Sequence, residues 1–107
     1  MIYTIEQIKE KIAPIARRYH IPAIYVFGSY ARGQATDASD LDIIIDRTGS
    51  TIRSLIDMGS LYCDLNESFN MEVDLITVDA LDQPEVERRT PGFKELLREE
   101  RVIIYEQ

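Results

Sequence analysis

Residues 41–45, Leu-Asp-Ile-Ile-Ile, are the stretch that most restricts how this chain can fold. Short runs of β-branched and apolar residues favour strands, and nearly unbroken hydrophobicity is typical of a strand in the middle of a sheet. Weaker runs of the same kind at 23–27, 71–78 and 102–105 predict three further strands. Since a sheet must be covered by other elements, these runs predict a layered fold.

The segments between the strands show helical periodicity. Thr4 and Gln7 make a capping-box pattern at the start of a helix that closes after Tyr19, and Pro14 predicts a kink or a break within it. Residues 51–69 predict a second helix and residues 93–100 a last one. We expect their inward faces to carry Ile52, Leu55, Ile56, Gly59, Tyr62 and Leu65 in the former, and Phe93, Leu96 and Leu97 in the latter.

Two connecting stretches are less regular. Residues 28–33 predict a turn that leads into a short helix, and residues 79–91, which contain Pro84 and Pro91, predict a short irregular helix. The element order α-β-α-β-α-β-α-β predicts an α/β fold, with helices packed on a small mixed sheet in a single domain over residues 1–107. The pattern leaves the direction of each strand open.

Charge and composition exclude several functions. The 107 residues carry a formal net charge of −7, which argues against direct binding to nucleic acid, because such binding needs a basic face. No apolar run approaches the roughly 18 residues of a membrane span, and the N-terminus lacks the pattern of a signal peptide. We therefore expect a cytoplasmic protein without a membrane partner. A single cysteine and a single histidine argue against zinc.

Asp40 and Asp42 stand two residues apart at the start of the strongest strand. Side chains alternate between the faces of a strand, so both carboxylates should project from the same face. Like charges held this close repel unless a cation lies between them. Oxygen ligands alone suit a hard cation, magnesium above all. Asp-x-Asp is also common on protein surfaces, so this pair alone is weak support for a site.

Asp74 is a third candidate, because it interrupts an otherwise apolar strand. An unpaired charge in the middle of a strand is costly. If this strand lies beside residues 41–45, the Asp74 carboxylate can reach the same cation. A salt bridge within the sheet is the alternative explanation.

Gly28-Ser29 follows one strand directly and precedes the expected short helix. Glycine allows a ligand to approach the backbone, and amides at a helix N-terminus favour an anion such as phosphate. No Gly-Lys-Ser/Thr follows, so this is not a P-loop. A Gly-Ser turn alone means little, but its conjunction with Asp-x-Asp and a later strand carboxylate is far more specific. Together they predict phosphoryl-type transfer, in which two metal ions about 4 Å apart clamp the reacting oxygens.

Gly28-Ser29, ten intervening residues, and Asp40-Leu41-Asp42 resemble the signature of the DNA polymerase β-like nucleotidyltransferase superfamily. Gly-Ser-Tyr-Ala-Arg-Gly followed by Ser-Asp-Leu-Asp is similar to its minimal nucleotidyltransferase branch, and the resemblance covers nearly the whole chain. It implies that Gly28 and Ser29 hold the triphosphate of ATP, and that Asp40, Asp42 and Asp74 ligate Mg²⁺, expected as two ions. It also implies that Asp74 can activate the acceptor. Arg32 contacts phosphate or a partner, or else forms a surface salt bridge.

The same resemblance implies a partner. Members of this branch are commonly antitoxins paired with a helical HEPN toxin, typically an RNase, and some add AMP to a tyrosine of that toxin. We therefore expect a nucleotidyltransferase that modifies a HEPN-type toxin protein. Two alternatives stay open. The chain could neutralise its partner by binding alone, or it could modify a small molecule, as aminoglycoside-modifying enzymes do.

Overall fold

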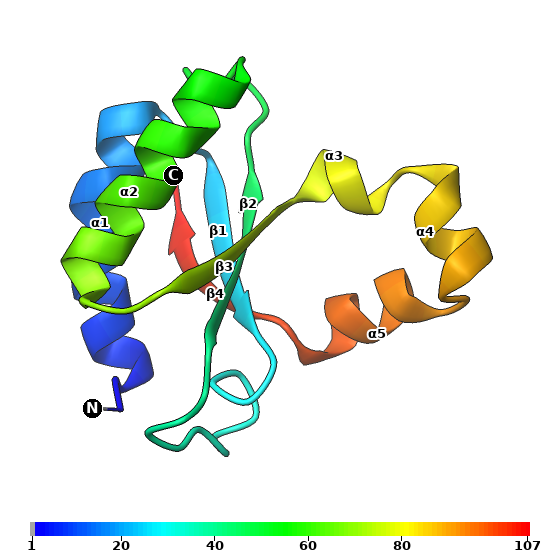
Figure 1. The fold of residues 1–107 in the computed structure, drawn as a ribbon, viewed down its shortest axis with the longest axis horizontal. Helices are drawn as coiled ribbons and strands as arrows, with labels where there is room; N and C mark the ends of the chain where they lie inside the picture. Colours follow the sequence, from blue (N-terminus) through cyan, green and yellow to red (C-terminus); the bar gives the residue numbers. More distant parts are fainter. Residues whose placement is uncertain (1) are drawn as a thin grey trace.

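The computed structural model describes residues 2–107. Their sheet has four strands in the order β3-β2-β1-β4, and Figure 1 shows how they lie. β1 runs antiparallel to both neighbours, whereas β2 and β3 are parallel. The strands are β1 (Ala23–Phe27), β2 (Leu41–Asp46), β3 (Val73–Thr77) and β4 (Val102–Glu106). The predicted mixed sheet is thus confirmed, with the 41–45 run in its interior and β3 at one edge.

Two long helices, α1 (Ile5–Tyr19) and α2 (Leu55–Phe69), lie on one side of the sheet in Figure 1. The main core lies between them and the strand residues that face them. Its members include Ile8, Ile12, Leu61, Leu65 and Phe69 from the helices and Ile24, Val26, Leu41, Ile43, Ile45 and Val73 from the strands. The Thr4–Gln7 capping box is present, and α1 continues through Pro14 without a break.

The expected start of α2 is wrong, and its expected inward face is only partly right, because Ile52 and Leu65 are buried whereas Leu55, Ile56 and Gly59 are exposed. The helix begins at Leu55, after a capping box formed by Ser54 and Asp57. Leu61, Leu65 and Phe69 are its buried residues, at the i, i+4 and i+8 spacing of one helical face. The first turn of α2 extends past the end of the sheet in Figure 1. Leu55 and Ile56 are accordingly 88% and 84% exposed.

Three shorter helices form an arm on the other side of the sheet (Figure 1): α3 (Val78–Leu81), α4 (Pro84–Arg89) and α5 (Phe93–Glu100). α3 contacts β2 and β3, and α4 contacts α5. In α5, Leu97 is buried as predicted, whereas Leu96 is exposed. None of the helices within residues 2–107 has the length and apolarity needed to cross a membrane.

Two leucine truncations test which face of α2 is buried. Leu65→Ala should lower the free energy of unfolding by about 2–5 kcal/mol, because it leaves a cavity in the core. Leu55→Ala should change it by no more than about 0.5 kcal/mol. Urea unfolding followed by circular dichroism measures both, and equal losses would contradict this orientation of α2.

Candidate active site

Two carboxylates meet where β2 and β3 run side by side. The parallel register pairs Asp42 with Asp74, and the Asp74 side chain lies near enough to raise the pKa of Asp42. The residues before and after Asp42 are buried in the main core. Because side chains alternate along a strand, Asp42 and Asp74 project from the other face, which α1 and α2 leave uncovered. The sheet thus places Asp74 where the sequence required it to be.

The environment of Asp42 disfavours its charge. Partial burial is the main cause, and the nearby carboxylates of Asp74 and Asp40 add to it, so that the pKa of Asp42 is raised to about 6. The Arg32 guanidinium acts in the opposite direction but more weakly. A cation placed between the two carboxylates would relieve the repulsion between them.

Gly28 lies directly against the Asp42 carboxylate. It follows the last residue of β1, Phe27, whose register partner is Asp42. A Cβ atom at Gly28 would lie 2.5 Å from Asp42 Oδ2, and the backbone φ there is +72°. Both facts require glycine at this position. The end of β1 and the start of β2 therefore form one continuous site.

The short helix expected after Gly28 is absent; residues 28–33 form consecutive turns. The Arg32 amide donates to the Gly28 carbonyl at 3.1 Å, and the Gln34 amide donates to the Ser29 carbonyl at 2.9 Å. Gly33, at φ +71°, lies outside the helical region and prevents continuation. The helix prediction was wrong because it ignored this second glycine. As in the first turn of a helix, the leading amides have no partner within the turn, so Ser29 still lies where amides can face an anion.

Arg32 forms a surface ion pair, which is one of the roles that the sequence left open for this residue. Its Nη1 lies 3.2 Å from Glu100 Oε2 on α5, and its side chain is 45% exposed. An exposed pair of this kind contributes little, about 0–1 kcal/mol, so the guanidinium can exchange partners at small cost. Glu100 was missed, because nothing in the sequence links two residues so far apart. Tyr30, within the turn, is buried in the main core.

Asp40 lies just before β2 and is exposed. The loop before it is held by reciprocal bonds, in which the Thr36 amide donates to Ser39 Oγ and the Ser39 amide donates to the Thr36 carbonyl. Within residues 2–107, no three acidic, histidine or cysteine side chains are grouped closely enough to hold a metal ion by themselves. The structure therefore joins Asp42 with Asp74, and brings Asp40 only close enough for its charge to act on Asp42.

A two-carboxylate pair is compatible with magnesium. Mg²⁺ is usually held by one or two carboxylates and takes its remaining ligands from water and substrate phosphates. The oxygen-only donors and the raised pKa of Asp42 agree with this chemistry. We therefore describe the site as Asp42 and Asp74, with Asp40 beside them and the Gly28–Ser29 turn next to Asp42.

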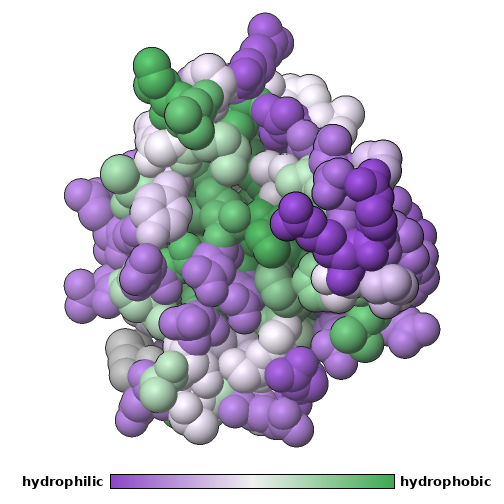
Figure 2. Space-filling view, turned by 45° about the vertical axis from the view of Figure 1, so that its right-hand side comes forward, coloured by the Kyte–Doolittle hydropathy of each residue, from purple (hydrophilic) through white to green (hydrophobic). Residues whose placement is uncertain are grey.

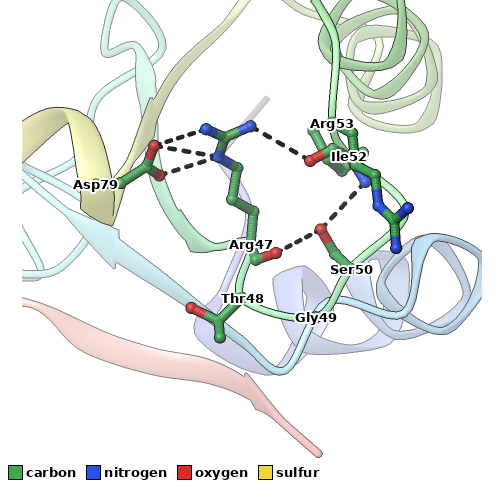
Figure 3. Close-up of a pocket in the computed structure, with 7 residues that line it drawn as sticks. All are labelled: Arg47, Thr48, Gly49, Ser50, Ile52, Arg53 and Asp79. Atoms are coloured by element: carbon green, nitrogen blue, oxygen red, sulfur yellow. Dashed lines mark hydrogen bonds and ion pairs between the residues drawn. The ribbon is translucent and has the colours of Figure 1, made fainter.

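A separate cavity of about 460 Å³ lies beyond the other end of β2 (Figure 3). Its central side chain, Arg47, donates from Nη2 to Asp79 Oδ2 at 2.8 Å and from Nη1 to the Ile52 carbonyl at 3.3 Å. These bonds tie the loop after β2 to α3. Because the Arg47 guanidinium is already bonded to Asp79 and to the Ile52 carbonyl, we assign these residues a role in holding the fold together and assign no ligand to this cavity.

Comparison with known proteins agrees with this geometry. The family model described as polymerase beta, nucleotidyltransferase matches residues 10–106. A provisionally named protein adenylyltransferase of Methanocaldococcus jannaschii is 35% identical over 77 residues, which cover 72% of this chain and 81% of that protein. A solved structure assigned as a minimal nucleotidyltransferase has a TM-score of 0.68 at 26% identity and covers 94% of this chain and 95% of its own. A toxin–antitoxin structure with AMP-PNP has a TM-score of 0.66 at 20% identity, covering 92% and 73%.

Two glycines in the same turn test the contact with Asp42. Gly28 and Gly33 both have positive φ, but a Cβ at Gly33 meets nothing within 4 Å. Gly33→Ala should lower the free energy of unfolding by about 1 kcal/mol for its backbone conformation alone. Gly28→Ala should cost at least about 1 kcal/mol more, because of overpacking. The excess should shrink in the Gly28→Ala/Asp42→Ala double variant. Equal losses for the two single variants would contradict the contact.

The raised pKa of Asp42 predicts a pH-dependent penalty on folding in the absence of divalent metal. The folded state holds this proton up to about pH 6, against an ordinary value of 3.8, so the contribution of Asp42 to stability is present at low pH and is lost as the pH rises through about 6. In a chelating buffer at pH 8, Asp42→Asn should therefore be more stable than the wild type by about 1 kcal/mol, after allowance for solvent screening. The difference should shrink at pH 5. A pH-independent difference in urea unfolding would contradict the assignment.

Proposed function

Because this chain belongs to the polymerase β-type nucleotidyltransferase family, we propose that it is a magnesium-dependent enzyme that transfers AMP from ATP to a hydroxyl group of a partner protein. The observation that carries this proposal is the pairing of Asp42 with Asp74 on neighbouring strands, directly beside Gly28. Relatives named as protein adenylyltransferases support AMP as the transferred group and protein as the acceptor class.

The residues on the Asp42 side of the pair would bind Mg²⁺ and the phosphates of ATP. Asp42, with Asp40 next to it, would hold Mg²⁺ together with the phosphates of ATP. The Gly28–Ser29 turn would bind the triphosphate, because it presents backbone amides beside these carboxylates. Bound Mg²⁺ would neutralise charge that develops on the phosphate oxygens. Arg32 would leave Glu100 to contact a phosphate, since their exposed pair costs little to break.

The proposed reaction is an in-line displacement at the α-phosphorus of ATP. The acceptor hydroxyl oxygen forms a bond to this phosphorus, the bond to the bridging oxygen breaks, and pyrophosphate leaves. The proton of the hydroxyl goes to the Asp74 carboxylate, which is exposed at the edge strand and open to an acceptor. Water exclusion and positioning would come from the partner, because Asp74 is not covered within residues 2–107.

We further propose that the acceptor is a tyrosine of a HEPN-type toxin, and that its modification makes this chain the antitoxin. The toxin–antitoxin structure with AMP-PNP, and one described as the toxin-antitoxin MntA-HpeT, both share the fold. They support a toxin as the partner and an adenine nucleotide as the substrate. A cytoplasmic location would follow from such a pairing.

Transfer of radiolabelled AMP tests the proposal directly. The protein is incubated with α-labelled ATP, Mg²⁺ and the HEPN-type protein encoded next to it. Label should appear on the partner, disappear in EDTA, and fall on the order of 100-fold in Asp42→Asn and Asp74→Asn. Asp46→Asn is the matched control, because Asp46 lies on β2, on the same face but at the other end, and it should retain transfer. If the wild type neither binds Mg²⁺–ATP by calorimetry nor transfers label, the enzymatic proposal fails. Full neutralisation of the toxin by Asp42→Asn would show that binding alone suffices.

A further inference from the structure

An apolar groove of about 400 Å³ runs between α2 and β3 and ends at the candidate active site. Its lining on α2 is Leu55, Met58, Gly59 and Tyr62, and on β3 it is Val73, Asp74 and Leu75. Figure 2 shows an apolar hollow in the middle of the visible face. Asp74 therefore belongs both to the groove and to the carboxylate pair.

The upper end of this groove has apolar side chains that its own fold does not use. Leu55 and Ile56 are 88% and 84% exposed, far more than the other large apolar side chains recorded as exposed in residues 2–107. Scattered single apolar residues need no explanation, but Leu55 lines the apolar groove and Ile56 is exposed next to it in the sequence, and exposed apolar residues beside such a groove are typical of a protein-binding surface.

The strand that borders the groove lies at an edge of the sheet. β3 pairs only with β2 in the described sheet. The Val73 amide donates to Asn66 Oδ1 at 2.9 Å, so the backbone groups of Val73 point outward, away from β2. Backbone polar groups in a strand reverse direction at each residue, and those of Leu75 therefore point outward as well. The Val73 amide is already bonded to Asn66, so another strand can pair with this edge mainly through the backbone groups of Leu75.

We propose that an extended segment of the protein acceptor adds to β3 as a fifth strand, with its reactive hydroxyl residue opposite Asp74. This inference rests on the proposed function and specifies where its acceptor binds. A residue opposite Asp74 would place its side chain on the same face as Asp42 and Asp74, because side chains of paired strands share a face. The residues on either side would point to the α2 side, into the groove.

The direction of the backbone groups along β3 also favours a hydroxyl residue opposite Asp74. The backbone groups of Asp74 point inward to β2, so an antiparallel partner residue opposite Asp74 would occupy a non-hydrogen-bonded position. The Cα atoms are then about 4.5 Å apart, and the side chains are closer than at hydrogen-bonded positions. The flanking residue opposite Leu75 would exchange both backbone hydrogen bonds with it. The geometry brings the acceptor hydroxyl to Asp74 without any movement of β3.

Charge selects the flanks of the segment. Among the side chains that line the groove, Asp74 carries the sole charge. Glu72, which precedes β3, is exposed and accepts a hydrogen bond from the Tyr62 hydroxyl at 3.2 Å. The whole chain has a net charge of −7. The acceptor segment that suits this surface has apolar residues on both sides of its hydroxyl residue and basic residues beyond them.

A designed peptide tests this inference. The probe is Lys-Val-Thr-Val-Tyr-Val-Thr-Val-Lys, whose valines would enter the groove when its tyrosine faces Asp74. The wild-type protein with Mg²⁺ and α-labelled ATP should label it. The same peptide with N-methyl groups on the two valines beside the tyrosine keeps the side chains but loses the edge hydrogen bonds, and its labelling should fall at least tenfold. Equal labelling of both peptides would overturn strand addition and indicate a helical or irregular occupant. No labelling of the parent peptide by protein that binds ATP would also overturn it.

Surface variants separate this inference from the proposed function. Leu55→Glu/Ile56→Glu changes two exposed side chains, so folding and Mg²⁺–ATP binding should stay at wild-type levels, whereas labelling of the partner should fall at least tenfold. Ile2→Glu is the control at another exposed apolar residue, 47% exposed near the N-terminus, and should label normally. If the wild type binds no ATP, the proposed function itself fails. If ATP binds and the double variant labels its partner as the wild type does, the docking surface alone is wrong.

Discussion

The repulsion between two carboxylates on adjacent strands is the constraint on which the functional interpretation depends. Folding places Asp42 beside Asp74 because both strands are held in parallel register by the buried residues next to them. Without a cation, burial and the neighbouring carboxylates raise the pKa of Asp42 to about 6, so the charged pair is held at a cost in stability above that pH. We propose that a ligand removes this penalty, because strongly perturbed carboxylates at the end of an otherwise apolar strand are typical of a functional site.

The rest of the chain positions this pair and leaves it accessible. α1 and α2 cover one face of the sheet, so the other face is left to the carboxylates and the arm of short helices (Figure 1). Gly28 brings the turn after β1 into contact with Asp42, so the turn proposed to bind phosphate lies beside the acidic pair. The edge position of β3 keeps Asp74 exposed. Asp42 thus lies on an interior strand, β2, which holds it in place, whereas Asp74 lies on the edge strand β3, where it is accessible.

Much of this could be predicted from local sequence, because strands and carboxylates leave local signals. The 41–45 run and the capping box at Thr4 placed their elements correctly, and an aspartate inside an apolar strand pointed to Asp74. The errors arose where one local sequence pattern is compatible with more than one helix boundary or buried face. Helical periodicity over 51–69 did not reveal that the helix begins only after its N-cap, Ser54. Leu55 and Ile56 therefore lie in the first turn of the helix, where both are exposed. No local pattern could reveal contacts made by tertiary structure, such as that of Arg32 with Glu100.

The central claim is that Asp42 and Asp74 are held together to bind a divalent cation with a nucleotide. It is tested most directly by following the Asp42 side-chain carboxyl carbon by ¹³C NMR as the pH is varied, with and without Mg²⁺ and a non-hydrolysable ATP analogue. Without metal, the pKa should be about 6. With Mg²⁺ and the analogue, it should fall below the ordinary value of 3.8, because the cation stabilises the charged form. A pKa that stays near 6 under both conditions would contradict the account.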